Sequence, residues 1–475
     1  MIKHHKTKII ATVGPASSDE KILEKMIKNG VDIFRINFSH GSYTDVKKII
    51  HSIRAINKKL NTNIGILADL QGPKIRIGKV RDNSVLLKPG EIISFTTKEC
   101  IGDESQLYIN YQHFPLDVSI GDKILINDGK FLLEVTSTNK KNLVKAKIIQ
   151  GGELSSNKGV NLPNTKISLP CLTEKDHKDL AFALDNNVEW IGLSFVRSVT
   201  DVVDLKETIK ESKKHARVIA KIEKPEALKE IDNIIDLSDG IMVARGDLGV
   251  ELPMEQVPLI QKMLVEKCIR ASRPVIIATQ MMESMIENFS PTRAEVNDVA
   301  NAVMDGADAV MLSAETSVGK YPILVIEAMQ RIVVRVEQEN RIYFREHAPE
   351  LKTQTFLSDS ICFNACVMAR HANVSAIVTM TNSGYTAFKI SSHRPKANIF
   401  VFTDNHSLLT TLSLVWGVRG FYYDKYESTD RTMEDLKNFL KREGFVKADD
   451  LVINTASMPL KEKGRTNMLR LSHVE

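Results

Sequence analysis

The chain has 475 residues, which is enough for two to four domains and a large buried core. Its charged fraction of 26% and apolar fraction of 43% are typical of a globular protein, and its formal net charge is only +5. No basic stripe interleaved with aromatic residues is present, so we expect no nucleic-acid partner. No apolar run could span a bilayer, the N-terminus lacks the apolar h-region of a signal peptide, and the five cysteines are scattered. We therefore expect a cytoplasmic location and no membrane partner.

A short apolar strand, a polar or glycine turn and an amphipathic stretch follow one another eight times, beginning at Thr7. Continuous apolar strands that alternate with helices are typical of parallel βα units. Eight such units predict a closed (β/α)8 TIM barrel, whose active site lies at the carboxyl ends of the strands. The strands are expected at Lys8–Val13, Asp32–Asn37, Ile64–Asp69, Trp190–Phe195, Val218–Glu223, Gly240–Arg245, Val275–Thr279 and Ala309–Ser313.

About a hundred residues separate the third and fourth strands, which is far more than an ordinary loop. The insert, residues 72–169, alternates β-rich runs with turns that contain glycine and aspartate. We expect a small β-barrel domain that grows from the barrel mouth and closes over the site as a lid. Its β-rich runs lie at Val85–Leu87, Lys123–Ile126, Phe131–Val135 and Leu143–Ile149.

After the eighth strand we expect a long helix over Pro322–Arg345 and then a polar joint. A helix over Ser358–His371 and five further strands predict a separate C-terminal α/β domain. These strands are expected at Ala376–Met380, Asn398–Phe402, Gly420–Tyr423, Leu451–Asn454 and Met468–Leu471. The predicted division is a barrel domain over residues 1–71 and 170–345, a lid domain over 72–169 and a C-terminal domain over 346–475.

Charged residues gather in the stretch Ala220–Leu252, at the ends of two predicted strands. Lys221 and Glu223 are two residues apart and so share a face of the first strand, while Asp247 follows the next strand. A lysine beside two carboxylates at otherwise apolar strand ends costs too much desolvation to be packing filler. When this stretch is considered by itself, a structural ion pair at a strand end is the alternative interpretation. Polar residues also end the other predicted strands, which favours a site at the barrel mouth.

Carboxylates and cations at one edge indicate a bound metal ion and an anionic substrate. Glu223 and Asp247 suit Mg²⁺, or Mn²⁺, and the few histidines nearby do not favour zinc. Arg35 and Arg76 add the fixed positive charge that phosphoryl transfer needs around the phosphate oxygens. Neither G-x-x-x-x-G-K-[ST] nor G-x-G-x-x-G is present, so a nucleotide would be bound in another way.

Many collinear motifs, which extend over essentially the whole chain, resemble those of the pyruvate kinase family. They read TKIIATVGPAS, IFRINFSHG, ADLQGPKIR, NKGVNLP, LTEKD, IAKIEKPEAL, MVARGDLGVELP, ATQMMESM, PTRAEVNDVANAVMDGADAVMLSAET and TNSGYTA. The resemblance implies a barrel, a lid and a regulatory C-terminal domain. It also implies transfer of a phosphoryl group from phosphoenolpyruvate to ADP, which gives pyruvate and ATP in the last step of glycolysis. Mg²⁺ and a homotetramer are implied as well.

The resemblance assigns roles at the substrate and metal sites. Lys221 would face the transferring phosphoryl group and stabilise the developing enolate, and Glu223 and Asp247 would hold the metal ion. Thr279 would orient the substrate carboxylate and help to protonate the enol carbon, and Arg35 would act beside the phosphate as a third catalytic residue. The residues implied to bind phosphoenolpyruvate are Arg35, Lys221, Ala244, Arg245, Gly246, Asp247 and Thr279.

On the ADP side, the resemblance implies that Arg76 holds phosphates and that Asn37 and His40 line the pocket. Lys158 in the lid would reach the ADP phosphates when the lid closes. Without the family, a solvated lysine on a glycine turn is the simpler interpretation of Lys158.

One departure from the family concerns the monovalent cation. Many members have Thr-Lys-Gly-Pro-Glu after the residue equivalent to Asp69, and that glutamate accompanies a bound potassium ion. Here the run ends in Lys74, as in the potassium-independent branch. The Lys74 ammonium would supply the positive charge that potassium supplies in other members. Asn37, Ser39 and Asp69 still match the potassium ligands, but we expect no potassium requirement.

A phosphate site is also implied in the C-terminal domain, where hydroxyls and free N–H groups precede a predicted helix. Ordinary N-capping is an equally good interpretation of these residues. The resemblance places an activating phosphorylated metabolite here. Tyr385 stands where some members that respond to fructose bisphosphate have a basic or small residue, so a sugar monophosphate or AMP is as plausible. The expected effector residues are Thr381, Asn382, Ser383, Gly384 and Thr386.

Two other functions fit parts of the sequence. A different barrel enzyme of metal-bound pyruvate enolates, such as an aldolase, would lack Lys158 and the lid. A non-catalytic metabolite sensor on the same scaffold would have lost Lys221, Glu223 or Asp247, and all three are present. The sequence therefore favours the kinase.

Overall fold

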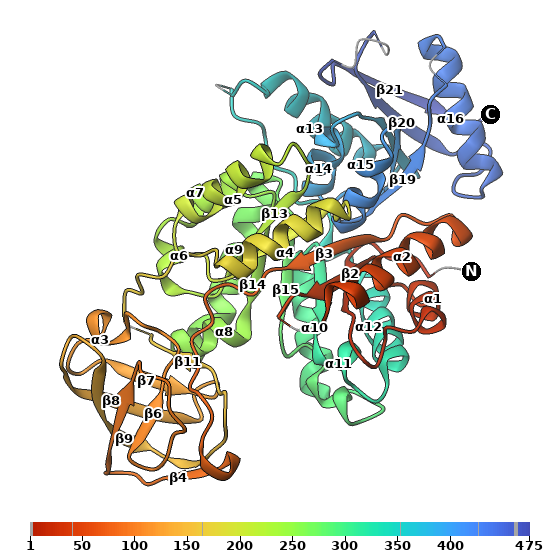
Figure 1. The fold of residues 1–475 in the computed structure, drawn as a ribbon. Coiled ribbons are helices and arrows are strands. Elements are labelled where there is room, and N and C mark those ends of the chain that lie inside the picture. The colour runs from red at the N-terminus through yellow and green to blue at the C-terminus, as the bar shows by residue number, and fades with distance from the viewer. Residues whose placement is uncertain (1–2, 40, 164, 352, 426, 460–463) are drawn as a thin grey trace.

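The computed structural model describes residues 3–39, 41–163, 165–351, 353–425, 427–459 and 464–475. The chain forms a central barrel with surrounding helices, an inserted sheet domain and a C-terminal α/β domain (Figure 1). The inserted domain, drawn in orange, and the C-terminal domain, drawn in blue, lie on opposite sides of the barrel (Figure 1).

The barrel consists of β1 (Lys8–Thr12), β2 (Ile33–Asn37), β3 (Gly65–Asp69), β12 (Trp190–Leu193), β13 (Arg217–Ile222), β14 (Gly240–Ala244), β15 (Val275–Ala278) and β16 (Ala309–Leu312). These eight parallel strands close in the order β1, β16, β15, β14, β13, β12, β3, β2, which confirms the predicted fold. Apart from β2 and β3, the strands end one or two residues earlier than predicted. The polar residues that follow them leave the ladder and form the barrel mouth.

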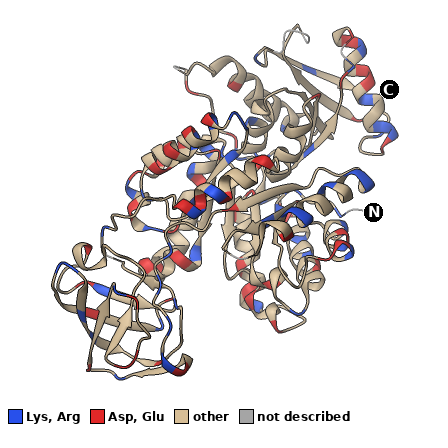
Figure 2. Ribbon diagram, viewed as in Figure 1, with Lys and Arg blue, Asp and Glu red and all other residues tan. Residues whose placement is uncertain are grey.

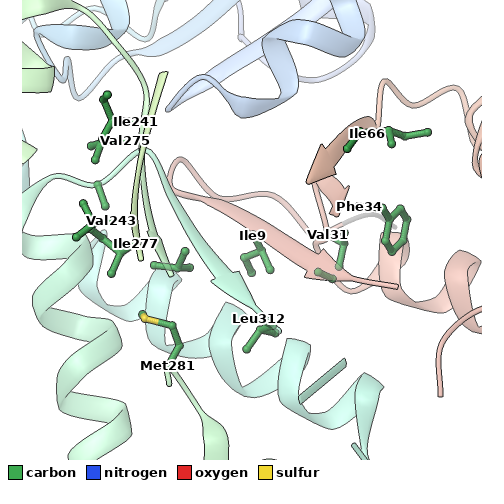
Figure 3. Packing of buried hydrophobic residues seen from close by; sticks show 14 of the residues in the cluster. Ile9, Val31, Phe34, Ile66, Ile241, Val243, Val275, Ile277, Met281 and Leu312 are labelled. Atoms are coloured by element: carbon green, nitrogen blue, oxygen red, sulfur yellow. The ribbon is translucent and has the colours of Figure 1, made fainter. Parts of the chain in front are cut away.

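Alternate residues of the barrel strands face the interior and the surrounding helices, as the two-residue period of a strand requires. Inside the barrel, bulky side chains of neighbouring strands fill the space, among them Trp190, Ile219, Met242 and Ile276. The residues between them pack outward against the helices, as Ile241, Val243, Val275 and Ile277 do (Figure 3). The barrel is therefore a packed core, and its polar groups are confined to its ends.

The helices around the barrel begin at sequence signals that the structure confirms. Asp19, Ser42, Thr173 and Thr292 each accept a backbone N–H of the helix that follows. The helices are α1 (Glu20–Lys28), α2 (Tyr43–Leu60), α4 (Glu174–Asp185), α5 (Val199–Glu211), α6 (Pro225–Lys229), α7 (Ile231–Leu237), α8 (Arg245–Glu251), α9 (Val257–Ala271), α10 (Arg293–Asp305), α11 (Ala314–Ser317) and α12 (Pro322–Val336).

The predicted helix Pro322–Arg345 is too long, because α12 ends at Val336. Beyond it the chain makes a short 3-10 turn over Asn340–Ile342. The backbone N–H groups of Phe344 and Arg345 then donate to carbonyls of the C-terminal domain, at Arg394 and His393. These contacts divert the chain from the helix axis.

The inserted domain contains β4 (Val85–Leu87), β5 (Ile92–Thr96), β6 (Gln106–Tyr108), α3 (Phe114–Asp117), β7 (Lys123–Ile126), β8 (Phe131–Thr138), β9 (Leu143–Gln150), β10 (Gly152–Leu154) and β11 (Val160–Asn161). Six strands form a curled sheet in the order β11, β7, β8, β9, β5, β6, and β4 pairs with β10. Inward-facing apolar residues give this domain a core of its own. The predicted β-rich insert is therefore confirmed.

The C-terminal domain contains α13 (Phe356–His371), β17 (Ala376–Met380), α14 (Tyr385–Ser392), β18 (Asn398–Thr403), α15 (His406–Thr411), β19 (Val418–Tyr422), α16 (Thr429–Arg442), β20 (Leu451–Ala456) and β21 (Met468–His473). Its sheet has the order β19, β18, β17, β20, β21, and only β21 is antiparallel to its neighbour. The α/β domain that the sequence predicts is therefore present.

A buried ion pair fixes the C-terminal domain to the barrel. Arg394 Nη2 lies 2.8 Å from Asp308 Oδ2, and Asp308 also accepts the backbone N–H groups of Val275 and Trp416. Asp308 directly precedes β16, so this contact lies at the amino ends of the strands. The barrel mouth, at the carboxyl ends, is left to face the inserted domain.

Charged residues of both signs are distributed over the outer helices, while the barrel strands carry few (Figure 2). In the part of the chain that the structure describes, no helix combines the length and the hydropathy needed to cross a bilayer.

Candidate active site

Lys221 lies at the centre of a charged cluster in the barrel mouth. Its Nζ is 2.9 Å from Oε1 of Glu223 and 3.1 Å from Oδ1 of Asp69, and it donates to Oγ of Ser194 at 2.8 Å. All four side chains are buried. They come from β3 and from the ends of β12 and β13, which are consecutive strands in the closed barrel. The lysine and glutamate that the sequence placed on one strand end are therefore in contact.

Charge pairing decides the ionisation of this cluster. Burial alone would lower the pKa of the Lys221 ammonium, but the carboxylates of Asp69 and Glu223 outweigh it and raise the pKa above its ordinary value. Burial likewise opposes ionisation of Asp69, yet Lys221 and Arg35 lower the pKa of this carboxyl. The Lys221–Asp69 pair is therefore ionised at neutral pH, and the amine is a fixed cation.

Arg35 adds a second fixed cation on the neighbouring strand β2. Its Nη2 lies 2.6 Å from Asp69 Oδ2, and its Nη1 donates to the hydroxyl of Thr12 at 3.1 Å. Both oxygens of Asp69 are thus paired with cations, and the guanidinium is held at the edge of the mouth. A positively charged rim of this kind suits a phosphate group.

Glu223 and Asp247 form the candidate metal site. Oε2 of Glu223 accepts the backbone N–H of Phe195 at 2.8 Å, which fixes the carboxylate. Burial raises the pKa of Glu223, and the charge of Asp247 adds to this rise. Within the described residues, the carboxylate of Asp247 has no hydrogen bond or ion pair. Two close carboxylates, one of them without a partner, fit a hard divalent cation that keeps several water ligands.

The residues expected around the substrate carboxylate divide into two groups. The backbone N–H of Gly246 donates to Oγ1 of Thr279 at 2.7 Å, and a Cβ at Gly246 would lie 3.3 Å from that oxygen. Thr279 has a φ of 68°, which is rare for a β-branched residue and typical of functional sites. The guanidinium of Arg245 instead donates to the carboxylate of Asp298, at 2.6 and 2.7 Å, and to the carbonyl of Thr279.

A cavity of about 950 Å³ opens beside these residues, between the inserted domain and the barrel. Its wall includes Gly246, Asp247 and Gln280 from the barrel and Asp128 and Gly129 from the insert. A second, smaller cavity, lined by Lys74, Lys224 and again Asp247, lies between the segments that connect the insert to the barrel. Asp247 therefore faces both spaces.

The structure brings two of the expected nucleotide residues, Arg76 and Lys158, together on neighbouring segments and places Asn37 elsewhere. Oδ1 of Asn37 accepts the backbone N–H of Ser39 at 3.0 Å beside the barrel mouth. Arg76 lies in the first segment that leads to the insert and donates to the carbonyl of Asn157 at 2.9 Å. Lys158 lies in the returning segment, where its carbonyl accepts the N–H of Ile77. His40 lies outside the described residues.

Lys74 is exposed, and its neighbourhood differs from that of the other three residues of the expected monovalent-cation site. Among the described residues, no hydrogen bond or ion pair joins its ammonium to Asn37, Ser39 or Asp69. Asp69 is neutralised by Arg35 and Lys221. Lys74 instead lines the smaller cavity with Asp247.

Of the five expected effector residues, all but Gly384 line a cavity of about 390 Å³ in the C-terminal domain, whose wall also includes Thr355, Ser358 and Arg465. Gly384 has a φ of 86°, and its N–H donates to Oγ1 of Thr381 at 3.0 Å. Thr386 is buried and shares a hydrogen bond of 2.6 Å with Thr466. Asn382 and Ser383 are exposed at its edge.

Four polar residues near the mouth were assigned no role from the sequence. Ser194 contacts the Lys221 amine, and Arg197 donates to two carbonyls of the returning segment. Lys224 and Glu251 form a buried ion pair of 2.6 Å. Ser194 could have been found as a polar residue at a strand end. The partners of the other three are distant in sequence, and no local pattern reveals them.

Comparisons with known proteins agree with this geometry. The model of the pyruvate kinase barrel domain matches residues 4–326, and that of the pyruvate kinase alpha/beta domain matches residues 359–472. The chain is 41% identical to a pyruvate kinase of Staphylococcus epidermidis over 472 residues, which are 99% of this chain and 80% of the relative. It is 41% identical to one of Corynebacterium efficiens over 466 residues, 98% of this chain and 97% of the relative.

A crystal structure of a pyruvate kinase from Cryptosporidium parvum has the same fold, with a TM-score of 0.93 and 32% identity. The similarity covers 99% of this chain and 96% of that one. The chain therefore belongs to the pyruvate kinase family and is a glycolytic phosphotransferase that forms pyruvate and ATP from phosphoenolpyruvate and ADP.

Proposed function

We propose that phosphoryl transfer takes place in the barrel mouth around the Lys221 amine. The observation that carries this proposal is the pairing of that amine with Asp69 and Glu223. Because the pairing keeps Lys221 charged, its ammonium can attract the phosphoryl group and stabilise the negative charge that develops on the enolate oxygen. Arg35, held by Asp69, supplies further positive charge to the phosphate oxygens.

Glu223 and Asp247 would hold Mg²⁺, or Mn²⁺, when the substrate binds. The ion supplies charge neutralisation and a fixed orientation for the phosphate and carboxylate of phosphoenolpyruvate. Asp247 supports this role because its carboxylate, in the part of the chain that the structure describes, has no hydrogen bond or ion pair and faces the cavity. Glu223 is already oriented by the N–H of Phe195.

Ala244, Gly246 and Thr279 would form the pocket for the substrate carboxylate. The Oγ1 of Thr279 is held between the N–H of Gly246 and the carbonyl of Ala278, so the hydroxyl has a defined position near the mouth. From there it would orient the carboxylate and help to bring a proton to the enol carbon. Arg245 would act indirectly, because its guanidinium donates to the carbonyl of Thr279 and so holds that residue in place.

ADP would bind between the mouth and the inserted domain, which acts as a lid. Asn37, Arg76 and Lys158, together with His40, are the residues proposed for this site. Lys158 and Arg76 lie in the two segments that connect the lid to the barrel, so movement of the lid would change their distance from Arg35. Only dense positive charge can bring two polyanions together.

We further propose a cytoplasmic homotetramer, with the domain divisions 1–71 with 170–345, 72–169 and 346–475. The separate cores of the insert and of part of the C-terminal domain support this division.

A phosphorylated metabolite would activate the enzyme from the cavity around Thr381–Thr386. Arg217 supports a connection between this cavity and the mouth, because its Nη2 donates to the carbonyl of Ser383 at 3.2 Å. Arg217 begins β13, and Lys221 lies near the other end of the same strand. A sugar monophosphate or AMP fits a cavity whose described lining contains Arg465 as its one arginine or lysine.

Replacing the Lys221 amine tests the proposed centre of catalysis. Lys221→Met should lower turnover by about a thousandfold, because the cation that stabilises the transition state is lost. A coupled assay with phosphoenolpyruvate and ADP measures this, and circular dichroism checks the fold. Lys210→Met, on an exposed face of α5, is the control and should keep full activity. A folded Lys221→Met variant that keeps more than about a tenth of the turnover contradicts the proposal.

The potassium requirement can be tested by cation replacement. Lys74 occupies the sequence position of the glutamate that accompanies potassium in many family members. We therefore expect turnover to change by less than about twofold when tetramethylammonium replaces potassium. The same assay at constant ionic strength in sodium is the control. A loss of more than about tenfold, restored by potassium, would reject potassium independence.

The effector site can be tested with a negative charge at its edge. Ser383→Asp should abolish activation by sugar monophosphates or AMP, because its carboxylate repels their phosphate, and should leave basal turnover within about twofold. Ser407→Asp, exposed in the first turn of α15, places the same charge outside the cavity and should leave activation intact. Retained activation in Ser383→Asp would place the effector elsewhere.

A further inference from the structure

The segment that returns from the lid to the barrel is held at two points. Arg197 donates from Nη1 to the carbonyl of Ile167 and from Nη2 to that of Leu169, both at 2.6 Å. Near the other end of the segment, Asn161 Nδ2 donates to Oε1 of Glu251 at 2.9 Å. Arg197 thus clamps backbone groups beside the barrel, whereas Asn161 joins the lid strand β11 to helix α8.

Glu251 joins the lid to a part of the barrel that is close in sequence to both proposed metal ligands. Its carboxylate, with 1% of the side chain exposed, also accepts from the Lys224 amine at 2.6 Å. Lys224 directly follows Glu223 in the chain. Asp247 precedes Glu251 by four residues on α8, so the two lie on the same face of that helix. Glu251, which lies in the same helix as Asp247, therefore joins the lid residue Asn161 to Lys224, two residues beyond the end of β13.

Stability alone does not explain this arrangement. A buried ion pair loses so much solvation that two apolar side chains of similar volume often pack as stably. When such a carboxylate also accepts a hydrogen bond from the lid, it fixes the orientation and the register of the lid strand relative to helix α8. The contact lies beside the small cavity that Lys74, Lys224 and Asp247 line between the two connecting segments.

We propose that Asn161 and Glu251 form a latch that positions the lid over the barrel mouth, and that both are positioning residues for the ADP half of the reaction. The proposal rests on the role of the lid lysine Lys158 in binding ADP phosphates. Lys158 precedes Asn161 by three residues, so the latch sets where its ammonium can reach. Phosphoenolpyruvate would bind to barrel residues, so we expect its binding to depend little on Asn161.

Hydrogen exchange tests the latch in the free enzyme. The backbone N–H of Val160 donates to the carbonyl of Ile75 and that of Ile77 to the carbonyl of Lys158, so these amides report on the joint. In Asn161→Ala they should exchange about tenfold faster, because a charge-assisted hydrogen bond has been removed. Asn142→Ala, in a turn on another part of the lid, is the matched control.

Steady-state kinetics test the consequence for the reaction. Asn161→Ala should raise KM for ADP by about tenfold and leave KM for phosphoenolpyruvate within about twofold. Asn161→Asp should be worse, because two carboxylates then face each other. Combining Asn161→Asp with Glu251→Gln exchanges amide and carboxylate and should restore KM for ADP to within about threefold of the wild type. A purely structural role would not give this selectivity or this rescue.

Lys158→Ala separates the latch from the proposed nucleotide role of the lid. If KM for ADP is unchanged in Lys158→Ala, the nucleotide role fails, and faster exchange of Val160 and Ile77 in Asn161→Ala still supports the latch. If Asn161→Ala exchanges like Asn142→Ala, the latch is wrong whatever Lys158→Ala shows.

Discussion

The rest of the structure depends on one ammonium group held between two buried carboxylates. Lys221 can remain charged inside the barrel only because Asp69 and Glu223 compensate for its lost hydration. Asp69 ends β3 and Lys221 lies in β13, with β12 between them in the closed sheet. Neither strand alone could make the pair, so the arrangement of β3, β12 and β13 side by side in the sheet creates the cationic centre that we propose for the phosphoryl group.

Strand β13 also joins the three parts of the chain. At its amino end Arg217 contacts the carbonyl of Ser383 in the C-terminal domain. Near its carboxyl end lies Lys221, and two residues beyond the strand Lys224 pairs with Glu251, which holds the lid through Asn161. A small displacement of this strand would therefore move the contact with Ser383, the Lys221 amine and the contact that holds the lid. We propose this strand as a physical route by which binding in one part would affect another.

The sequence predicted what depends on local pattern. Continuous apolar runs gave the eight barrel strands, and a spacing of two residues placed Lys221 beside Glu223. The predicted end of α12 at Arg345 was wrong because residues 344 and 345 are held against the C-terminal domain, by contacts with residues that are distant in the sequence. The Asn161–Glu251 contact was missed for the same reason: it joins segments that are far apart in the sequence, and only the folded barrel brings them together. The charge pattern indicated a metal role for Glu223 and Asp247 and a phosphate role for Arg35 and Arg76, and the other proposed roles came from the family resemblance.

The most direct test of this charge arrangement is to measure the protonation state of the Lys221 amine as the pH is raised. Lysines labelled with ¹³C at Cε report it by NMR, and the resonance of Lys221 is identified by its absence in a variant without this lysine. Held by Asp69 and Glu223, the amine should remain protonated at a pH where ordinary lysines, with a pKa of about 10.4, have lost half of their protons. Loss of the proton below about pH 9 would show that burial outweighs the two carboxylates, and the proposed cationic centre would be wrong.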